Sequence, residues 1–414
     1  MKRLLSSHTR GQSMVFMVFL TIAIFGVLAF SLDMGYTYYN RRWAQNAADS
    51  GALAAARELC IDPNPATRVT NATNAAIDYV ESKNLAFGVN SQTVTGITFG
   101  PDGGLEEGEV QVYVAINHPN FVANFFGRDS TTVPATAAAG CFAPGAAYGV
   151  IPLAWKCNKI IDVFGEEVCD MTFISDDDEC ALPDDYMYIF IESADELFWC
   201  EELGEPPEVL PGVDVILMEC GANLEIVNTA QPEHGWSWVD LDGSIGGQCN
   251  ANDLRGWVED GFGETIQINT WVPSCSGGMT TIYGSVAALD DSAIPIFDLV
   301  CESNDARNDC DGSAPPLPDL WNDLTDTDLP LIPSSQYTFH LKTFAKLKIS
   351  CVDAGGNKCD QSIHARQRLV DNNPGILQNM ETIEGCFVGG FIPGLSGKPS
   401  YGVDAGAWTL YLTR

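Results

Sequence analysis

The chain has 414 residues, more than one ordinary hydrophobic core holds, so the sequence predicts two or more domains. Apolar residues make up 46% of it, which excludes general disorder. The formal net charge of −34 would repel polyanions, so we expect no nucleic-acid partner. No Lys or Arg occurs between Lys159 and Arg255, and this acidic region is typical of a solvated surface.

Residues 1–11 form a basic leader that contains Lys2, Arg3 and Arg10. The run from Met14 to Leu32 that follows contains no charged residue. As a helix it would be about 28 Å long, close to the thickness of the hydrocarbon core of a bilayer. The leader charges place the N-terminus in the cytoplasm by the positive-inside rule, although Arg41 and Arg42 beyond the run weaken that bias.

A cleaved secretory signal is the alternative to a retained membrane helix. Its apolar region is normally about 7–15 residues long and precedes a small-x-small cleavage site. Here the run is longer, and Asp33 and Gly35 follow it together with Tyr36, Tyr38 and Tyr39. Tyrosines are common where a helix leaves a membrane, so the pattern favours a retained helix.

The helix is expected to continue to residue 59, because the segment from Asn40 contains many helix formers and no proline. Small side chains recur on one face at spacings of three and four, which lets another backbone approach closely. Two alternatives stay open: the chain's own globular part packs there, or neighbouring copies and partner helices do. The stripe consists of Ala44, Ala47, Ala48, Gly51, Ala52 and Ala55.

This N-terminal region resembles the TadE/TadG-like proteins of the tight-adherence (Flp) pilus-assembly system. The resemblance rests on Arg10–Gln12, the apolar run, Asp33 with Gly35, and the segment RRWAQNAADSGALAAA from Arg41 to Ala56. It implies a pilin-like protein that assists pilus assembly at the cell envelope.

The resemblance also implies a leader cleavage site between Gly11 and Gln12. Prepilins of this kind carry Glu at the fifth place after the cleavage-site glycine, where this chain has Phe16. Both a cleaved and a retained leader therefore stay open.

All 14 cysteines lie at or beyond residue 60, and none forms a CxxC pair. An even number beyond a membrane segment predicts disulfides in an oxidising compartment; buried free thiols in a reducing cell are the alternative. The pairing stays open, although Cys301 with Cys310 and Cys351 with Cys359 would close short loops.

The fold class expected for the whole chain is α+β. Residues 12–59 form the transmembrane and extended helix, and residues 60–147 a small pilin-like α+β domain. There we expect a helix over 67–83, strands over 92–99, 110–116 and 131–138, and a short helix within 120–126.

Residues 148–414 are expected to form a β-rich extracytoplasmic domain with disulfides and long insertions. Short apolar runs alternate there with Gly, Pro, Asn and Asp, which is typical of strands and turns. The strands expected are 149–155, 186–191, 213–218, 265–272, 293–300, 337–350 and 408–412, with a surface loop over 313–335.

No catalytic motif stands out, and we expect no enzymatic activity. Ser276 lies in a CSGG segment, with His234, His340 and His364 as notional bases, but a triad depends on geometry that sequence order does not supply. We expect no cofactor, apart from a weak indication of structural calcium, which prefers oxygen ligands from loops. The calcium candidates are Asp240, Asp242, Asp305, Asp309 and Asp311.

The sequence thus predicts a membrane-anchored TadE/TadG-like minor pilin or pilus-assembly protein with a structural role. The expected partners are the membrane and other pilus or secretion-machinery proteins, with self-association through the N-terminal helix. The N-terminus would be cytoplasmic and the bulk extracytoplasmic or at the cell surface. The alternative is a membrane-tethered adhesin or ligand-binding module that shares only the anchor; a membrane-tethered hydrolase is the third hypothesis.

Overall fold

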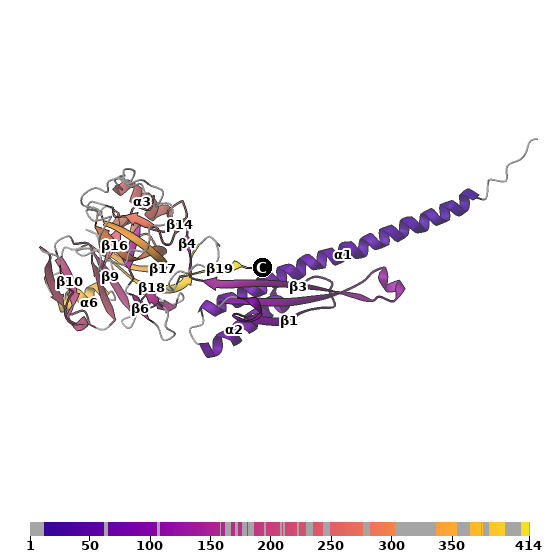
Figure 1. Cartoon of the computed structure of the whole chain (residues 1–414), viewed down its shortest axis with the longest axis horizontal. Helices are drawn as coiled ribbons and strands as arrows, with labels where there is room; N and C mark the ends of the chain where they lie inside the picture. Colours follow the sequence, from indigo (N-terminus) through magenta and orange to yellow (C-terminus); the bar gives the residue numbers. More distant parts are fainter. Residues whose placement is uncertain are drawn as a thin grey trace, which may run out of the picture. The chain divides into compact units, whose positions relative to one another are not determined.

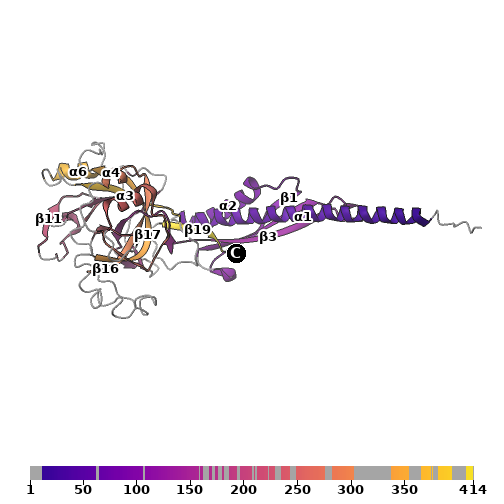
Figure 2. The same cartoon turned by 90° about the horizontal axis from the view of Figure 1, so that it is seen from above.

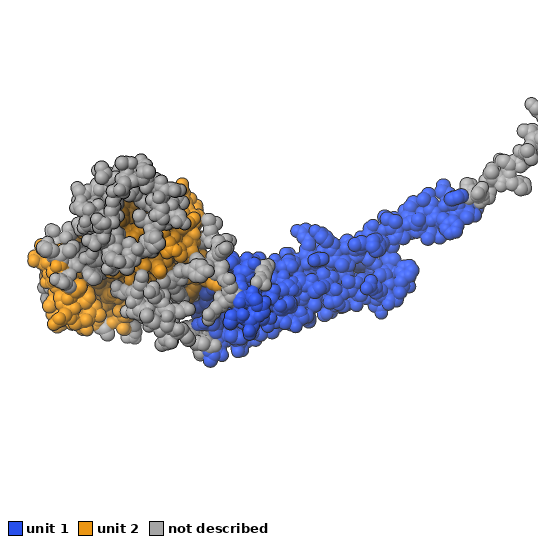
Figure 3. Space-filling view, in the orientation of Figure 1, with its two compact units in different colours: residues 1–141, 410–414 blue, residues 142–409 orange. Residues whose placement is uncertain are grey.

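The structure is a computed structural model of the chain. It describes residues 12–413 except 62–64, 106–107, 158, 162–166, 170–172, 176–179, 181–185, 194–195, 208, 210–211, 222, 229–234, 243–248, 276–281, 303–336, 354–364, 374, 376–380 and 394–406. The chain divides into two compact units (Figure 3). Unit 1 comprises Met1–Cys141 with Leu410–Arg414, and unit 2 comprises Phe142–Thr409.

A single helix, α1 (Gln12–Ile61), provides the first 50 described residues. It contains no proline, so no backbone donor is lost along its length. The N-terminal end of α1 extends beyond the other elements of unit 1 in both Figure 1 and Figure 2. The long N-terminal helix and its continuation past the apolar run are confirmed.

Unit 1 packs the second part of α1 and a shorter helix against a three-stranded antiparallel sheet. The shorter helix, α2 (Pro65–Asp78), begins at a proline, which suits a first helical position, and ends in a π-helical turn, η1 (Tyr79–Lys83). The strands are β1 (Ser91–Phe99), β2 (Glu109–Pro119) and β3 (Ser130–Phe142), in the order β1-β2-β3. The connections contain two 3-10 turns, η2 (Asp102–Gly104) and η3 (Ala123–Phe126).

Two long-range links hold the ends of unit 1 in place. A disulfide joins Cys60, at the end of α1, to Cys141, at the end of β3. The C-terminal segment also returns to this unit, where the backbone N–H of Thr413 donates to the carbonyl of Ala138 at 2.8 Å. No local sequence pattern predicts that return, because the two residues joined by the hydrogen bond are 275 positions apart (413 − 138 = 275).

Unit 2 is β-rich, as expected. Its longest strands, β16 (Asp291–Glu302) and β17 (Tyr337–Asp353), form an antiparallel pair, and β18 (Thr382–Phe391) joins the other edge of β17. The sheet continues from β16 through β5 (Leu153–Lys156) to β13 (Trp236–Trp238), and β18 pairs with the start of β19 (Ala407–Leu412).

The remaining elements of unit 2 are short. The strands are β4 (Ala146–Ala147), β6 (Lys159–Ile161), β7 (Glu167–Cys169), β8 (Phe173–Ser175), β9 (Met187–Ile191), β10 (Glu196–Cys200), β11 (Asp214–Met218), β12 (Leu224–Asn228), β14 (Ile266–Gln267) and β15 (Trp271–Pro273). The helices are η4 (Glu201–Leu203), α3 (Ala251–Asp260), α4 (Tyr283–Val286) and α6 (Ala365–Asn372).

The core of unit 2 is rich in aromatic side chains. Trp155, Tyr188 and Phe387 are almost fully buried and pack together, with ring centroids between 4.7 and 5.7 Å apart. Such contacts bury large apolar areas and favour the tilted and edge-on geometries seen here. Removal of these large apolar surfaces from water stabilises the unit.

Four disulfides are described in unit 2: Cys157–Cys169, Cys180–Cys386, Cys200–Cys220 and Cys249–Cys275. Cys351 is disulfide-bonded too. The predicted disulfide framework is therefore confirmed for these cysteines. The suggested closures of Cys301 with Cys310 and of Cys351 with Cys359 stay predictions, because Cys310 and Cys359 lie outside the described residues.

The mixed helix and sheet content expected from the sequence is confirmed. One local difference concerns residues 265–272, where the structure has two short strands, β14 and β15, in place of one. Asn269 separates them with a positive φ of 58°, a backbone conformation that a continuous strand does not contain. The surface loop expected over 313–335 lies outside the described residues.

Candidate functional site: the N-terminal helix

No described part of the chain covers the first part of α1. An 18-residue window of the helix has a mean hydropathy of 2.7, and none of it is buried. The large apolar side chains between Met14 and Leu32 are each between 51% and 73% exposed. An apolar surface of this length is not stable in water, so it needs lipid or another protein around it. Within the described residues, α1 is the one helix long and apolar enough to cross a membrane.

Asp33 ends the apolar run and binds a loop of the sheet. Its carboxylate accepts backbone N–H groups of Phe121 at 2.9 Å, Val122 at 3.1 and 3.2 Å, and Ala123 at 2.7 Å. Charge-assisted bonds of this kind are stronger than bonds between neutral groups. Asp33 therefore holds the loop between β2 and β3 against α1 at the position along the helix where the apolar run ends.

Tyr36, one turn further along, makes a second attachment. Its hydroxyl donates to the carbonyl of Gly88 at 2.9 Å, and its ring lies 5.0 Å from that of His118 and 5.2 Å from that of Phe121. An open apolar groove lies beside it, lined by Ser31, Leu32, Gly35, Tyr36, Tyr39 and Phe121. Tyr36 thus holds the loop before β1 against α1, within one helical turn of the place where Asp33 holds the loop between β2 and β3.

The small-residue stripe lies in the second part of α1, inside unit 1. Each of its members is buried, namely Ala44, Ala47, Ala48, Gly51, Ala52 and Ala55. A Cβ atom on Gly51 would lie 2.7 Å from Cγ2 of Val80 and 3.4 Å from the carbonyl oxygen of Ala76. The stripe is thus covered by α2, η1 and the sheet of the same chain. A partner helix would have to bind an exposed part of α1, and the long run of exposed apolar side chains on this helix lies before Asn40.

The residues suggested for hydrolytic chemistry are only partly described. Ser276, His234 and His364 lie outside the described residues, as does Gly11 of the leader. His340 is buried on β17, where its Nδ1 lies 2.6 Å from Oδ1 of Asp298 and its ring packs on Trp271 at 5.1 Å. This pair could orient an imidazole, but a triad also needs a nucleophile against the other ring nitrogen.

Of the calcium candidates, Asp240 and Asp242 are described, and Asp305, Asp309 and Asp311 are not. Asp240 is 2% exposed, and Oδ1 accepts the backbone N–H of Asp242 at 3.3 Å. Burial, together with the carboxylates of Asp242 and Asp253, raises the pKa of Asp240 to about 7. A calcium ion would need six to eight oxygens, so two side chains do not make a site on their own.

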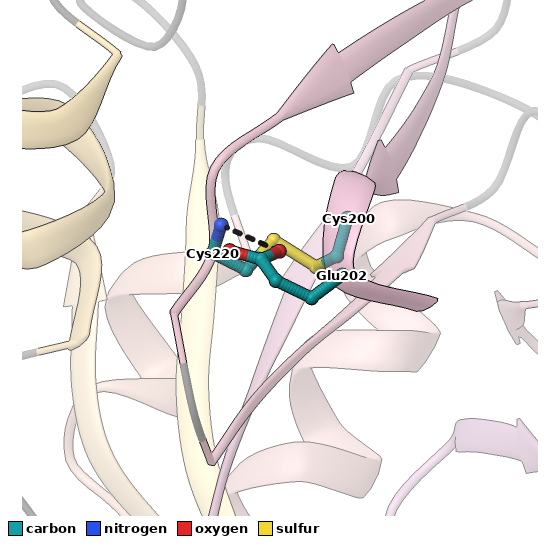
Figure 4. Close-up of side chains that lie close together, drawn as sticks. All are labelled: Cys200, Glu202 and Cys220. Atoms are coloured by element: carbon teal, nitrogen blue, oxygen red, sulfur yellow. Dashed lines mark hydrogen bonds between the residues drawn. A yellow bond between two sulfur atoms is a disulfide. The ribbon is translucent and has the colours of Figure 1, made fainter. Parts of the chain in front are cut away.

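A second cluster brings Cys200, Glu202 and Cys220 close together (Figure 4). The two sulfurs form a disulfide, so neither is a thiolate available to a metal. The Glu202 carboxylate accepts the backbone N–H groups of Gly221 at 2.9 Å and Cys220 at 3.2 Å. These bonds, the one from Gly221 first, lower the pKa of Glu202. The cluster therefore closes the turn after β11 and does not bind a metal in this state.

Sequence reasoning missed the attachment of the two loops to α1. Asp33 stood out only as the end of the apolar run, and Asn120–Phe126 only as a short helix. The two adjacent phenylalanines between Asn124 and Gly127 are unusual in a short polar turn, but they do not contact Asp33 and gave no signal for this attachment.

Residues 11–58 match the family described as putative Flp pilus-assembly TadE/G-like. The match covers nearly the whole of α1 and extends no further along the chain. No curated protein and no solved structure matched the chain. The chain therefore has a TadE/G-like N-terminal region, and its resemblance to that family is confirmed there.

Proposed function

We propose that this protein is a membrane-anchored structural component of Flp pilus assembly, either a minor pilin or an assembly factor. The observation that carries the proposal is the coincidence of the TadE/G-like segment, residues 11–58, with one continuous helix. The first part of that helix is apolar and exposed, and the second part is the core of a small α+β unit. This is the construction that a pilin-like anchor requires.

The disulfides support an extracytoplasmic location for both units. Five described bridges link residues from Cys60 to Cys386, and such bridges persist in oxidising compartments. The basic leader then lies in the cytoplasm, in agreement with the positive-inside rule.

The packing of α1 supports an anchored role over that of a bulk filament subunit. The small-residue stripe is covered inside unit 1, which leaves the exposed apolar segment before Asn40 as the surface of α1 best suited to contacts between copies. Phe16 in that segment cannot pair with a neighbouring amine as an acidic residue would. We therefore place the protein at the membrane or at a pilus tip, with its partners among the pilus-assembly proteins.

Deletion and complementation in the native cell test this function. Loss of the gene should abolish or greatly reduce Flp filaments, and the intact chain should restore them. The chain should also co-purify with the pilus-assembly machinery after cross-linking in cells. Filaments unaffected by the deletion would contradict the proposal, and binding of the chain to a glycan or surface in that case would favour the adhesin alternative.

Sheared filaments separate the anchored role from the filament role. We expect this chain to be absent from them or present in trace amounts relative to the main subunit. If it is their main subunit, the anchored role is wrong. N-terminal sequencing of the same material shows whether the chain begins at Met1 or at Gln12.

A further inference from the structure

Two loops of unit 1 lie at the same end of its sheet. One precedes β1 and the other joins β2 to β3. The N–H of Asn90 donates to the carbonyl of Asn117 at 2.7 Å, and Pro119 pairs with Ser130 across the strands, so both loops emerge at this edge. Figure 1 shows the β2–β3 turn beside α1, reaching toward the N-terminal end of that helix.

These loops carry exposed apolar side chains, four of them phenylalanines, which we call the apolar rim: Leu85, Phe87, Phe121, Phe125 and Phe126. Phe87, Phe125 and Phe126 are 86–87% exposed, which leaves nearly their whole surface without protein contact. Scattered apolar residues are common on protein surfaces, but several phenylalanines gathered at one edge indicate an interaction site.

The height of the rim on α1 is fixed by the contacts of Asp33 and Tyr36. Asp33 binds the backbone of residues 121–123, and Tyr36 binds Gly88 beside Phe87. The apolar run ends at Leu32, one residue before Asp33, after about 28 Å of helix, so Asp33 lies where the hydrocarbon core gives way to the headgroups.

We propose that the apolar rim inserts into the interface of the same membrane that α1 spans, so that unit 1 binds lipid through Phe87, Phe121, Phe125 and Phe126. The inference rests on the membrane anchoring in the proposed function. Aromatic and aliphatic side chains bind favourably at the boundary between headgroups and acyl chains. Arg128 and Asp129 follow the phenylalanines and cancel in charge, so the apolar contacts carry the binding and anionic lipid is not required.

The insertion would make the anchor a two-point attachment. A single helix leaves its globular part free to rotate and tilt, whereas a helix and a lipid-bound rim together define an orientation relative to the bilayer. A second copy or a pilus-assembly protein is the other possible occupant of the rim, and it is distinguished by the experiment below.

A photoreactive phenylalanine analogue, p-benzoylphenylalanine, placed at Phe125 tests the proposal in the full chain. The chain is reconstituted in vesicles of phosphatidylethanolamine and phosphatidylglycerol, irradiated, and analysed by mass spectrometry for lipid adducts. Phe25, 66% exposed on the apolar run, is the positive control; Tyr113, 37% exposed and six positions before Pro119 on β2 (119 − 113 = 6), is the control away from the membrane. Formation of the Cys60–Cys141 bridge verifies folding of each variant.

We expect lipid adducts at Phe25 and Phe125 and few at Tyr113, with at least about a tenfold difference between Phe125 and Tyr113, as the partitioning of one buried phenylalanine implies. Adducts at Phe25 but not above the Tyr113 level at Phe125 would overturn the rim proposal and leave the anchoring intact. Adducts of Phe125 with protein only would also overturn it and assign the rim to a protein partner. Absence of lipid adducts at Phe25 would contradict the anchoring itself.

Discussion

Asp33 is the residue on which the attachment of the β2–β3 loop to the helix depends. The Asp33→Ala variant should lose the bonds to three backbone N–H groups and weaken the local structure by about 1–2 kcal/mol. Hydrogen exchange at residues 121–123 should then be roughly tenfold faster, because the opened state becomes more populated.

Asp33→Asn is the matched control for that variant. It keeps one acceptor oxygen at the same position and should retain part of the protection. Unchanged exchange in Asp33→Ala would mean that the loop is held by its packing on Tyr36 and not by the carboxylate.

Gly51 is the point of closest approach on the buried face of α1. Gly51→Ala should destabilise unit 1 by about 1–3 kcal/mol, because the new methyl group would overlap the side chain of Val80. Val80 is β-branched, so its side chain has little freedom to move away. Gly35→Ala is the control in the same helix, since a Cβ there meets nothing within 4 Å. Urea unfolding of the full chain in detergent measures both variants, and equal midpoints would contradict the close packing.

Asp240 gives unit 2 a pH dependence. Its pKa of about 7 lies above the ordinary value of 3.8, so the folded state binds a proton more tightly than the unfolded state. The stabilisation that protonated Asp240 contributes is fully present below pH about 4 and is lost as pH rises through about 7. The free energy of unfolding of unit 2 should fall by roughly 2–4 kcal/mol over this range. Asp240→Asn should remove this loss, so its advantage in melting temperature over the parent chain should grow between pH 5 and pH 8. An advantage independent of pH would contradict this.

At the scale of elements, the disulfide Cys60–Cys141 connects the end of α1 to the end of β3 across 81 positions. The double variant Cys60→Ser with Cys141→Ser should lower the free energy of unfolding of unit 1 by roughly 4 kcal/mol, because a long loop is released in the unfolded chain. The equivalent change at Cys157 and Cys169, which close only 12 positions, should cost unit 2 less, about 3 kcal/mol. Calorimetry resolves the two units, and a larger loss for the short bridge would contradict the loop-length argument.

Local patterns predicted many of these elements. The apolar run and the proline-free segment after it indicated α1. Segments of strand-forming residues bounded by turn residues indicated β1, β2, β9 and β17, since these signals depend only on neighbours in the sequence. Helix α3 was missed although a capping box, Asn250 with Asp253, marks its start. The parallel pairs β9 with β12 and β10 with β11 were not predictable, because pairing between distant segments leaves no local signal.

The candidate site was predictable to a similar extent. The stripe from Ala44 to Ala55 was visible, but which surface covers it depends on α2 and the sheet, and the sequence left both alternatives open. Tyr36 contacts Gly88 and Asp33 contacts residues 121–123, and no spacing of residues in the sequence predicts these contacts.

At the scale of the whole molecule, the apolar run, the disulfides and the net charge are consistent with one another. The apolar run is long enough to span a membrane, and the disulfides are typical of proteins that fold in an oxidising compartment. The net charge of −34 keeps the extramembrane part soluble and repels polyanions. An anchored envelope component of pilus assembly satisfies all three conditions.

Protease digestion of intact spheroplasts from the native cell tests this anchored topology most directly. Proteinase K added from outside should digest both units and leave one protected fragment that contains Met14–Leu32 and whose N-terminus is either Met1 or Gln12. The same fragment should resist alkaline extraction from the membrane, as an integral helix does. A chain that stays whole until the membrane is opened, or a chain that alkali releases intact, would contradict the account.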